Sequence, residues 1–235
     1  MKSMKKERAC CLLSTAFVFA IFLFSGCSPS TPDYAGDDAI SVISGDIALV
    51  KDFFVEAINS ETGETVTSFR MNDAKYWSES GYTLWTVWDD DPGAVDFSRR
   101  FVRLSKSDGD QSAGYGIVIC QRDVDGIGKC MLTVLINTEG YYAIGKAINA
   151  KYEAIHSWER SALLKTGYGA GNKIDVAYEK SSKEFALFFN GGFVRYFRDD
   201  DEPVLTSGNN GYIVVVSPQD DFPDEYIDLK FFETR

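Results

Sequence analysis

The sequence predicts an all-β protein built as a two-sheet antiparallel sandwich. Apolar and polar residues alternate with a period of two along most of the chain, and β-branched and aromatic residues dominate these stretches. Gly, Asn, Asp and Pro interrupt the stretches at intervals of about 8–14 residues, which is typical of sandwiches and barrels. Residues 40–235 show no internal repeat and no second linker, so we expect one sandwich domain there.

Strand-like stretches follow one another along this domain. The clearest hairpin covers residues 185–197, where Asn190, Gly191 and Gly192 tolerate the positive φ of a tight reversal. Residues 47–59 fit a short helix or a strand nearly equally well. The strands expected in chain order are 81–88, 114–121, 130–137, 140–148, 172–179, 184–190, 192–197, 211–217 and 225–233.

The first 26 residues have the pattern of a secretory signal peptide. Lys2, Lys5, Lys6 and Arg8 form a basic start, and fifteen mostly apolar residues follow, from 10 to 24. A membrane-spanning helix needs roughly 20 apolar residues, so this segment is too short to span. We therefore expect export.

Residues 24–27, "FSGC", resemble the lipobox of bacterial lipoproteins, although Phe24 stands where Leu is usual. This resemblance implies that the Cys27 thiol receives a diacylglyceryl group, with acyl chains such as palmitate, and that cleavage precedes it. Each buried acyl CH₂ contributes about 0.8 kcal/mol, so two or three chains anchor a protein firmly. Residues 27–39 then form a lipidated cysteine and a flexible tether. An ordinary signal peptide with an incidental cysteine is the alternative.

Charge and residue Ser28 bear on location and partners. Removing residues 1–26 lowers the formal charge from −11 to −14, and no basic stripe offers a surface for nucleic acid. The acidic runs at 89–91, 199–202 and 220–221 indicate solvated loops, with cation sites as the alternative. Ser28 is not the aspartate that marks inner-membrane retention, so the outer membrane or cell surface is favoured.

Two further cysteines follow Cys27 in the exported part, Cys120 and Cys130. They flank a Gly-rich turn between two expected strands and so could face each other across a hairpin. A disulfide there would contribute about 2–3 kcal/mol in the chain-entropy model. Two buried free thiols are the alternative, and a metal site lacks further nearby ligands.

Residues 96–232 resemble the concanavalin A/laminin G-like jelly rolls, in particular the branch related to the 3-keto-disaccharide hydrolase domain. The resemblance rests on "SAGYGIVI", on "YYAIGKAI" before a tryptophan-ended turn, on "NKIDVAYE" with the "FALFFNGG" hairpin, and on "SGNNGYIVVVS". It implies a jelly-roll fold that hosts lectins, glycosidases and adhesive modules alike. It also suggests Ca²⁺, for which Asp123 and Asp125 are candidates. Residues 40–95 are not matched.

No catalytic pattern is complete. Sandwich glycosidases need two carboxylates on one strand face, but Lys173 replaces the first in "KIDVAYE", which leaves Asp175 and Glu179 as solvent-facing residues. His156 is the only histidine and lacks a nucleophile elbow, so we expect a surface or turn histidine. The sequence therefore favours a binding protein over an enzyme.

Aromatic residues next to carboxylates suit sugar binding, because rings stack on apolar sugar faces while carboxylates accept hydrogen bonds from sugar hydroxyls. Only one face of the strand "YTLWTVW" can be core, so a tryptophan there is expected to be partly exposed. The ligand-binding candidates are Trp85, Trp88, Asp89, Asp90, Tyr141 and Trp158. We expect a lipid-anchored binding or adhesion module of the bacterial envelope, with a glycan or protein ligand. The alternatives are a divergent carbohydrate-active enzyme and a structural subunit of an envelope assembly.

Overall fold

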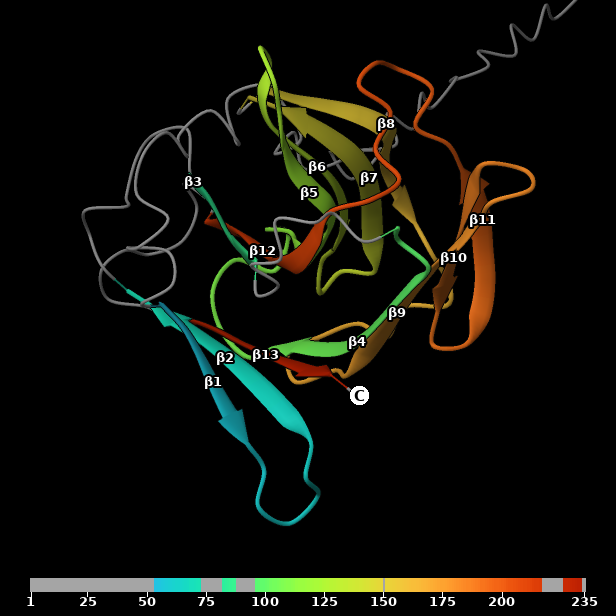
Figure 1. The fold of residues 1–235 in the computed structure, drawn as a ribbon. Helices are drawn as coiled ribbons and strands as arrows, with labels where there is room; N and C mark the ends of the chain where they lie inside the picture. The colour runs from blue at the N-terminus through green and yellow to red at the C-terminus, as the bar shows by residue number, and fades with distance from the viewer. Residues whose placement is uncertain (1–52, 73–81, 88–95, 150, 217–225, 234–235) are drawn as a thin grey trace, which may run out of the picture. The chain divides into compact units, whose positions relative to one another are not determined.

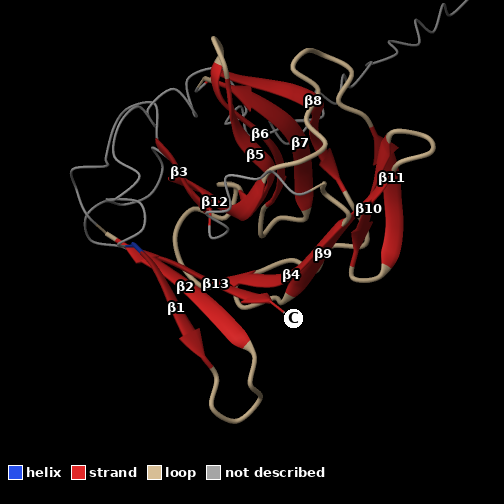
Figure 2. Cartoon of the chain, in the orientation of Figure 1, coloured by secondary structure: helices blue, strands red, loops and turns tan. Residues whose placement is uncertain are grey.

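The protein is a two-sheet antiparallel jelly-roll sandwich, as predicted (Figures 1 and 2). The structure is a computed structural model that describes residues 53–72, 82–87, 96–149, 151–216 and 226–233. They belong to one compact unit, Thr31–Arg235. The predicted signal peptide, Cys27 and the predicted tether lie outside the described residues. Among the described residues, no helix is long and apolar enough to cross a membrane.

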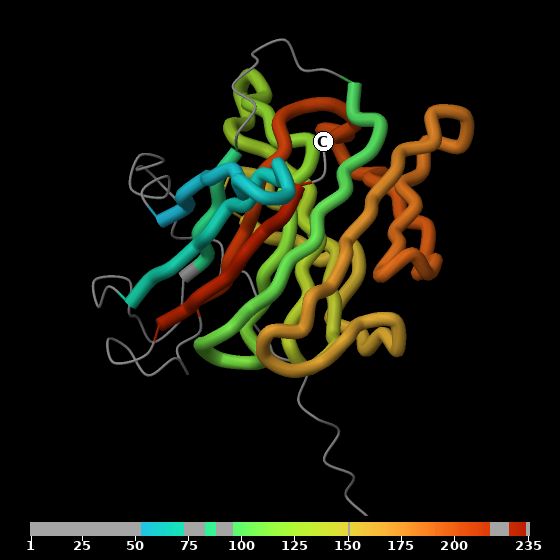
Figure 3. Tube along the Cα trace, turned by 90° about the horizontal axis from the view of Figure 1, so that it is seen from below, coloured from blue at the N-terminus to red at the C-terminus, as the bar shows by residue number. Residues whose placement is uncertain are grey.

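All strand pairs are antiparallel. One sheet has seven strands in the order β1 (Phe54–Ile58), β2 (Thr65–Met71), β13 (Ile227–Glu233), β4 (Arg99–Lys106), β9 (Asn172–Glu179), β10 (Glu184–Phe189) and β11 (Gly192–Phe197). The other has six, in the order β3 (Tyr82–Val87), β12 (Asn209–Val216), β5 (Tyr115–Val124), β6 (Gly128–Ile136), β7 (Tyr141–Ile148) and β8 (Lys151–Arg160). Figure 3 looks onto the seven-stranded sheet from its outer side.

The main core lies between the sheets and consists of the inward-facing alternate residues of both. Aromatic rings connect the two layers directly. Tyr212 of β12 stacks on Phe231 of β13 with ring centroids 4.3 Å apart, and Tyr142 of β7 meets Phe189 of β10 edge-on at 5.2 Å. Such pairs contribute beyond the area that they bury.

The six-stranded sheet is also apolar on its outer side. There a second cluster of buried residues runs across the sheet from Trp85 on β3 to Trp158 on β8. Burial on both faces explains why β5, β6, β7 and β12 read as almost continuous apolar runs instead of alternating ones.

Several sequence predictions need correction or completion. The sequence predicted a turn ending at a tryptophan after residues 141–148. Residues 151–160, which include this tryptophan, instead form the ten-residue strand β8. Within residues 47–59, of which 53–59 are described, Phe54–Ile58 form the strand β1. The hairpin β1–β2 lies in the stretch that the family resemblance does not match. All nine stretches predicted to be strands contain one.

The hairpin of β10 and β11 turns as predicted but is not regular. Asn190 and Gly191 both have positive φ, 52° and 86°, as a tight two-residue turn requires. Phe188 pairs with Phe193, but Leu187 pairs with Arg195, so Val194 is one extra residue in β11. This β-bulge changes the face on which the following side chains lie.

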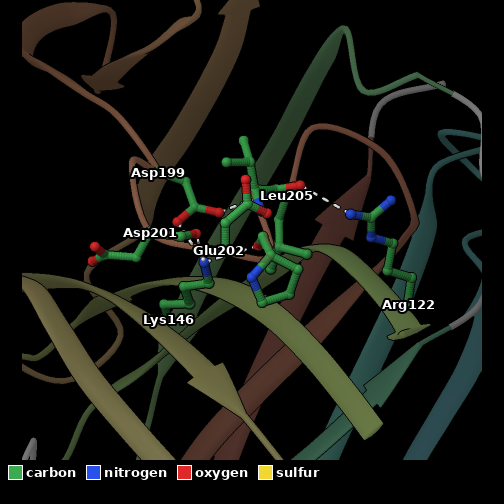
Figure 4. Close-up of polar contacts among 8 residues, drawn as sticks. Arg122, Lys146, Asp199, Asp201, Glu202 and Leu205 are labelled. Carbon is green, nitrogen blue, oxygen red and sulfur yellow. Dashed lines mark hydrogen bonds and ion pairs between the residues drawn. The ribbon is translucent and has the colours of Figure 1, made fainter. Parts of the chain in front are cut away.

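A buried ion pair fastens the loop between β11 and β12 to the six-stranded sheet (Figure 4). Lys146 on β7 is 3% exposed, and its Nζ lies 2.7 Å from Oδ1 of Asp199. The same Nζ donates to the carbonyl oxygens of Asp201 (2.6 Å) and Pro203 (2.9 Å), and the amide of Leu205 donates to Oδ2 of Asp199 (2.7 Å). All three ammonium donors therefore have acceptors.

This arrangement corrects the interpretation of residues 199–202 as solvated. Asp199 is buried as the partner of Lys146, whereas Asp200, Asp201 and Glu202 are exposed. The acidic run thus contains one structural carboxylate, whose ammonium partner lies 53 residues away in the chain.

We expect Lys146→Met to lower the free energy of unfolding by about 3–5 kcal/mol, because it leaves the Asp199 carboxylate buried without a counter-charge. The double variant Lys146→Met/Asp199→Leu should recover most of this loss, since it removes both charges. Urea denaturation measures each value. Lys151→Met, at an exposed position on β8, is the matched control. Equal stability of Lys146→Met and wild type would contradict the prediction.

Candidate functional site

The described aromatic candidates belong to the apolar cluster on the outer side of the six-stranded sheet, where both tryptophans are buried. Trp85 and Trp158 are 4% and 7% exposed and belong to the second apolar cluster, against which Tyr141 packs. The expectation that one tryptophan of this strand is partly exposed fails at Trp85, because both faces of the strand are buried, and it stays a prediction for Trp88. These side chains serve packing of the six-stranded sheet.

The other predicted ligand and metal residues divide into two groups. Trp88, Asp89 and Asp90 lie outside the described residues. Asp123 and Asp125 are exposed in the β5–β6 hairpin. The described part of the chain holds no group of three or more His, Cys, Asp or Glu side chains that could bind a metal ion, so calcium at this turn stays a prediction.

Cys120 and Cys130 are free thiols, the alternative to the disulfide, and both are buried in the main core. Burial raises the pKa of each thiol above that of an ordinary cysteine, most strongly for Cys120. They therefore remain protonated near neutral pH and are poor nucleophiles and poor metal ligands.

Asp175 is not solvent-facing, contrary to the sequence prediction. It is 4% exposed, and Arg99 of β4 binds it in a bidentate manner, with Nε to Oδ1 at 2.8 Å and Nη2 to Oδ2 at 2.6 Å. Glu179, its expected neighbour on the strand face, is exposed. Both oxygens of Asp175 are thus occupied by a guanidinium that leaves them unavailable for nucleophilic chemistry.

Three aromatic side chains form an exposed surface on the outer side of the seven-stranded sheet, beside this ion pair. Phe193 and Tyr196 of β11 are 48% and 58% exposed, with ring centroids 4.9 Å apart. Phe188 of β10 meets Phe193 edge-on at 5.6 Å. We call Phe188, Phe193 and Tyr196 the aromatic surface. Single exposed apolar residues are ordinary, but three rings joined through Phe193 form a candidate interaction site.

The strand register sets the polar surroundings of the aromatic surface. Directly paired residues place Phe101, Asp175, Phe188 and Phe193 in one row across β4, β9, β10 and β11. Because neighbouring strands are about 4.8 Å apart, this row spans roughly 14 Å. Lys173 of β9 lies over the ring of Phe101, with Nζ 3.7 Å from the centroid. The row therefore begins with a ring and a carboxylate, each in contact with a cation, and ends with the two rings of Phe188 and Phe193.

A second polar group lies where the edge strands of the two sheets, β8 and β11, face each other. Three side chains surround one oxygen, Oε2 of Glu159. Nε2 of His156 is 2.6 Å away, the hydroxyl of Tyr142 3.3 Å, and Nη1 of Arg195 3.4 Å. We call Tyr142, His156, Glu159 and Arg195 the edge cluster. The sequence predicted a surface or turn histidine, but His156 lies on strand β8 and is half-buried.

The edge cluster shifts the titration of two of its members. Burial lowers the pKa of His156 below its ordinary value of 6.5, Arg195 lowers it further, and Glu159 partly opposes both. Burial is also the main cause of the raised pKa of Tyr142. Near neutral pH the imidazole is therefore uncharged, and its Nε2–H donates a hydrogen bond to the Glu159 carboxylate.

Sequence reasoning missed both groups for different reasons. The predicted two-residue turn at Asn190 and Gly191 already pairs Phe188 with Phe193, so these two could have been found from the sequence. Tyr196 and Arg195 could not have been found in this way. Strict alternation from Phe193 would place Tyr196 inward and Arg195 outward, the reverse of their positions in the structure. Their orientation depends on the bulge at Val194, for which the sequence carries no signal that we recognise.

Comparison with known proteins concerns the fold alone. No protein-family model matches the chain, and no curated protein matches it in sequence. The carbohydrate-binding module CBM66 from Bacillus subtilis is 10% identical, with a TM-score of 0.47 over 74% of this chain and 88% of that one. A Bacillus subtilis protein of unknown function with a galectin-like fold is 13% identical, with a TM-score of 0.44 over 79% and 92%. The family 7 alginate lyase A1-II′ is 10% identical, with a TM-score of 0.46 over 77% and 79%.

The single histidine allows a clean test of the edge cluster. We expect the pKa of His156, measured by NMR titration of its ring resonances, to lie below 6.5. Glu159→Gln should lower it further, because an attractive charge is lost, whereas Arg195→Gln should raise it. Since the folded value is depressed, the stability that depends on neutral His156 is present above about pH 6.5 and decreases as the pH falls below it.

Glu153→Gln, an exposed position on the same strand, is the matched control and should leave the value unchanged. Shifts of the same sign in Glu159→Gln and Arg195→Gln would show that the edge cluster is not formed as described.

Proposed function

We propose that this protein is a lipid-anchored, exported glycan-binding module of the bacterial envelope, and that the aromatic surface holds the glycan. The observation that carries the proposal is the contact between Phe193 and Tyr196, two exposed rings on β11 that Phe188 on β10 connects to the Arg99–Asp175 pair. Aromatic rings stack on the apolar faces of sugars, while Arg99, which is itself exposed, offers N–H donors to hydroxyl groups.

The arrangement of these rings favours a chain of sugars over a single one. The row from Phe101 to Phe193 crosses four strands, and Tyr196 extends the aromatic surface along β11. A buried partner fixes Arg99, and the sheet fixes the rings, so little conformational entropy is lost on binding. An extended ligand lying across the strands would contact rings and polar groups in turn.

The anchoring part of the proposal rests on the N-terminal sequence. The basic start, the short apolar segment and the "FSGC" stretch support export and acylation of Cys27, and the polar residues up to 39 supply a tether. A module held in this way collects glycan at the envelope, with the outer membrane or cell surface as the favoured location.

We expect Tyr196→Ala and Phe193→Ala each to weaken polysaccharide binding about tenfold, because one stacking ring of a few is worth roughly 1 kcal/mol or more. Affinity electrophoresis through gels containing a panel of neutral and acidic polysaccharides measures the change. Thermal unfolding should stay within a few degrees of wild type, since both side chains are exposed.

Tyr226→Ala is the matched control, because Tyr226 is also exposed but precedes β13, well separated in the sheet order from β11. The aromatic surface would be excluded as the binding site if both ring variants were slowed as much as wild type in every polysaccharide gel that slows wild type.

For Cys27 we expect that mass spectrometry of protein from native membranes finds a diacylglyceryl thioether on Cys27 and no residues 1–26. Cys27→Ala should release the protein from the membrane fraction, while Cys10→Ala serves as the control because Cys10 lies in the part that is removed. A free Cys27 thiol, or a retained N-terminal peptide, would overturn the anchoring.

A further inference from the structure

The edge cluster has the composition of a carboxylate-binding site that is filled by the chain's own carboxylate. Three donors from three strands, on both sheets, point at one oxygen of Glu159: Tyr142 on β7, His156 on β8 and Arg195 on β11. We propose that this cluster binds the carboxylate of an acidic sugar, which takes the place of Glu159.

The hydrogen-bond donors Tyr142 and His156 are fixed by packing, whereas the Glu159 carboxylate that they contact is exposed. Tyr142 is 3% exposed and packs edge-on against Phe189 in the main core, and His156 packs against the Tyr142 ring at 5.7 Å. By contrast, the side chain of Glu159 is 54% exposed. Exchange of Glu159 for a ligand therefore leaves the protein core in place and moves only an exposed side chain into solvent.

The charge of the cluster selects an acid over a neutral sugar. Glu159 is the only carboxylate in contact with Arg195 among the described ion pairs. A hydroxyl in its place would leave the half-buried guanidinium without a counter-charge, and hydrogen bonds between two charged groups are roughly twice as strong as neutral ones. A ligand carboxylate restores both the charge and the three hydrogen bonds.

The position of the cluster connects it with the aromatic surface. Arg195 and Tyr196 are consecutive residues of the edge strand β11 and lie on opposite faces of the sheet, because Arg195 pairs with inward-facing Leu187 and Tyr196 with Ala186. A glycan on the aromatic surface can reach the cluster around this edge. The inference rests on the proposed function only in naming a sugar as the carrier of the carboxylate.

The test follows the ring resonances of His156 while glucuronate, acetate or glucose is added. We expect glucuronate to shift them in wild type, and to bind about tenfold more tightly to Glu159→Ala, because the competing carboxylate is gone. Glu159→Gln, which preserves the shape of the side chain, should change affinity in the same direction. Glu159→Ala/Arg195→Gln should lose the response, and Glu153→Ala and Arg160→Gln, at exposed positions on β8, should behave as wild type.

Three results would overturn the inference: no shift with glucuronate in a folded Glu159→Ala variant, an equal shift with glucose, or an equal affinity for acetate. The first two exclude a carboxylate site, and the third excludes a sugar acid as its ligand. Failure of the proposed function is seen separately, because Tyr196→Ala tests polysaccharide retention and leaves the three donors to the carboxylate unchanged.

Discussion

One extra residue in β11 determines where the side chains that we propose to bind ligand point. In a regular strand, Phe193 and Arg195 would share one face and Val194 and Tyr196 the other. The bulge at Val194 turns Tyr196 outward beside Phe193 and turns Arg195 inward toward Glu159. The aromatic surface and the edge cluster are therefore two consequences of the same backbone irregularity, at a sheet edge where bulges are common.

Much of the fold could be predicted from the sequence, and the failures have identifiable causes. Strand periodicity and the turn at Asn190 and Gly191 depend on local chemistry, so they appear in the sequence. Strand β8 was missed because half of it faces solvent and its pattern is irregular, with the register shifts near Ile144. The pairing of Lys146 with Asp199 was missed because it joins residues far apart in the chain.

The candidate site was harder to predict, because the exposure of a side chain depends on whether other residues cover its face of the sheet. The assumption that only one side of the strand with Trp85 could be core failed, since a second apolar cluster lies on the outer side of the six-stranded sheet. Trp85 and Trp158 are consequently buried, and the exposed rings lie on the opposite sheet. Residue type alone marked aromatics as candidates but could not distinguish packing rings from exposed ones.

If both proposed binding groups are used, their position on one edge strand has a thermodynamic consequence. Phe193, Tyr196 and Arg195 all belong to the six-residue strand β11. A ligand bound to the two rings and a ligand bound to Arg195 therefore contact the same strand. If the two contacts belong to one molecule, the second forms at a high effective concentration, so weak single contacts combine into firm binding. The bulge is what makes this possible, because it presents one strand to two different surfaces without lengthening it.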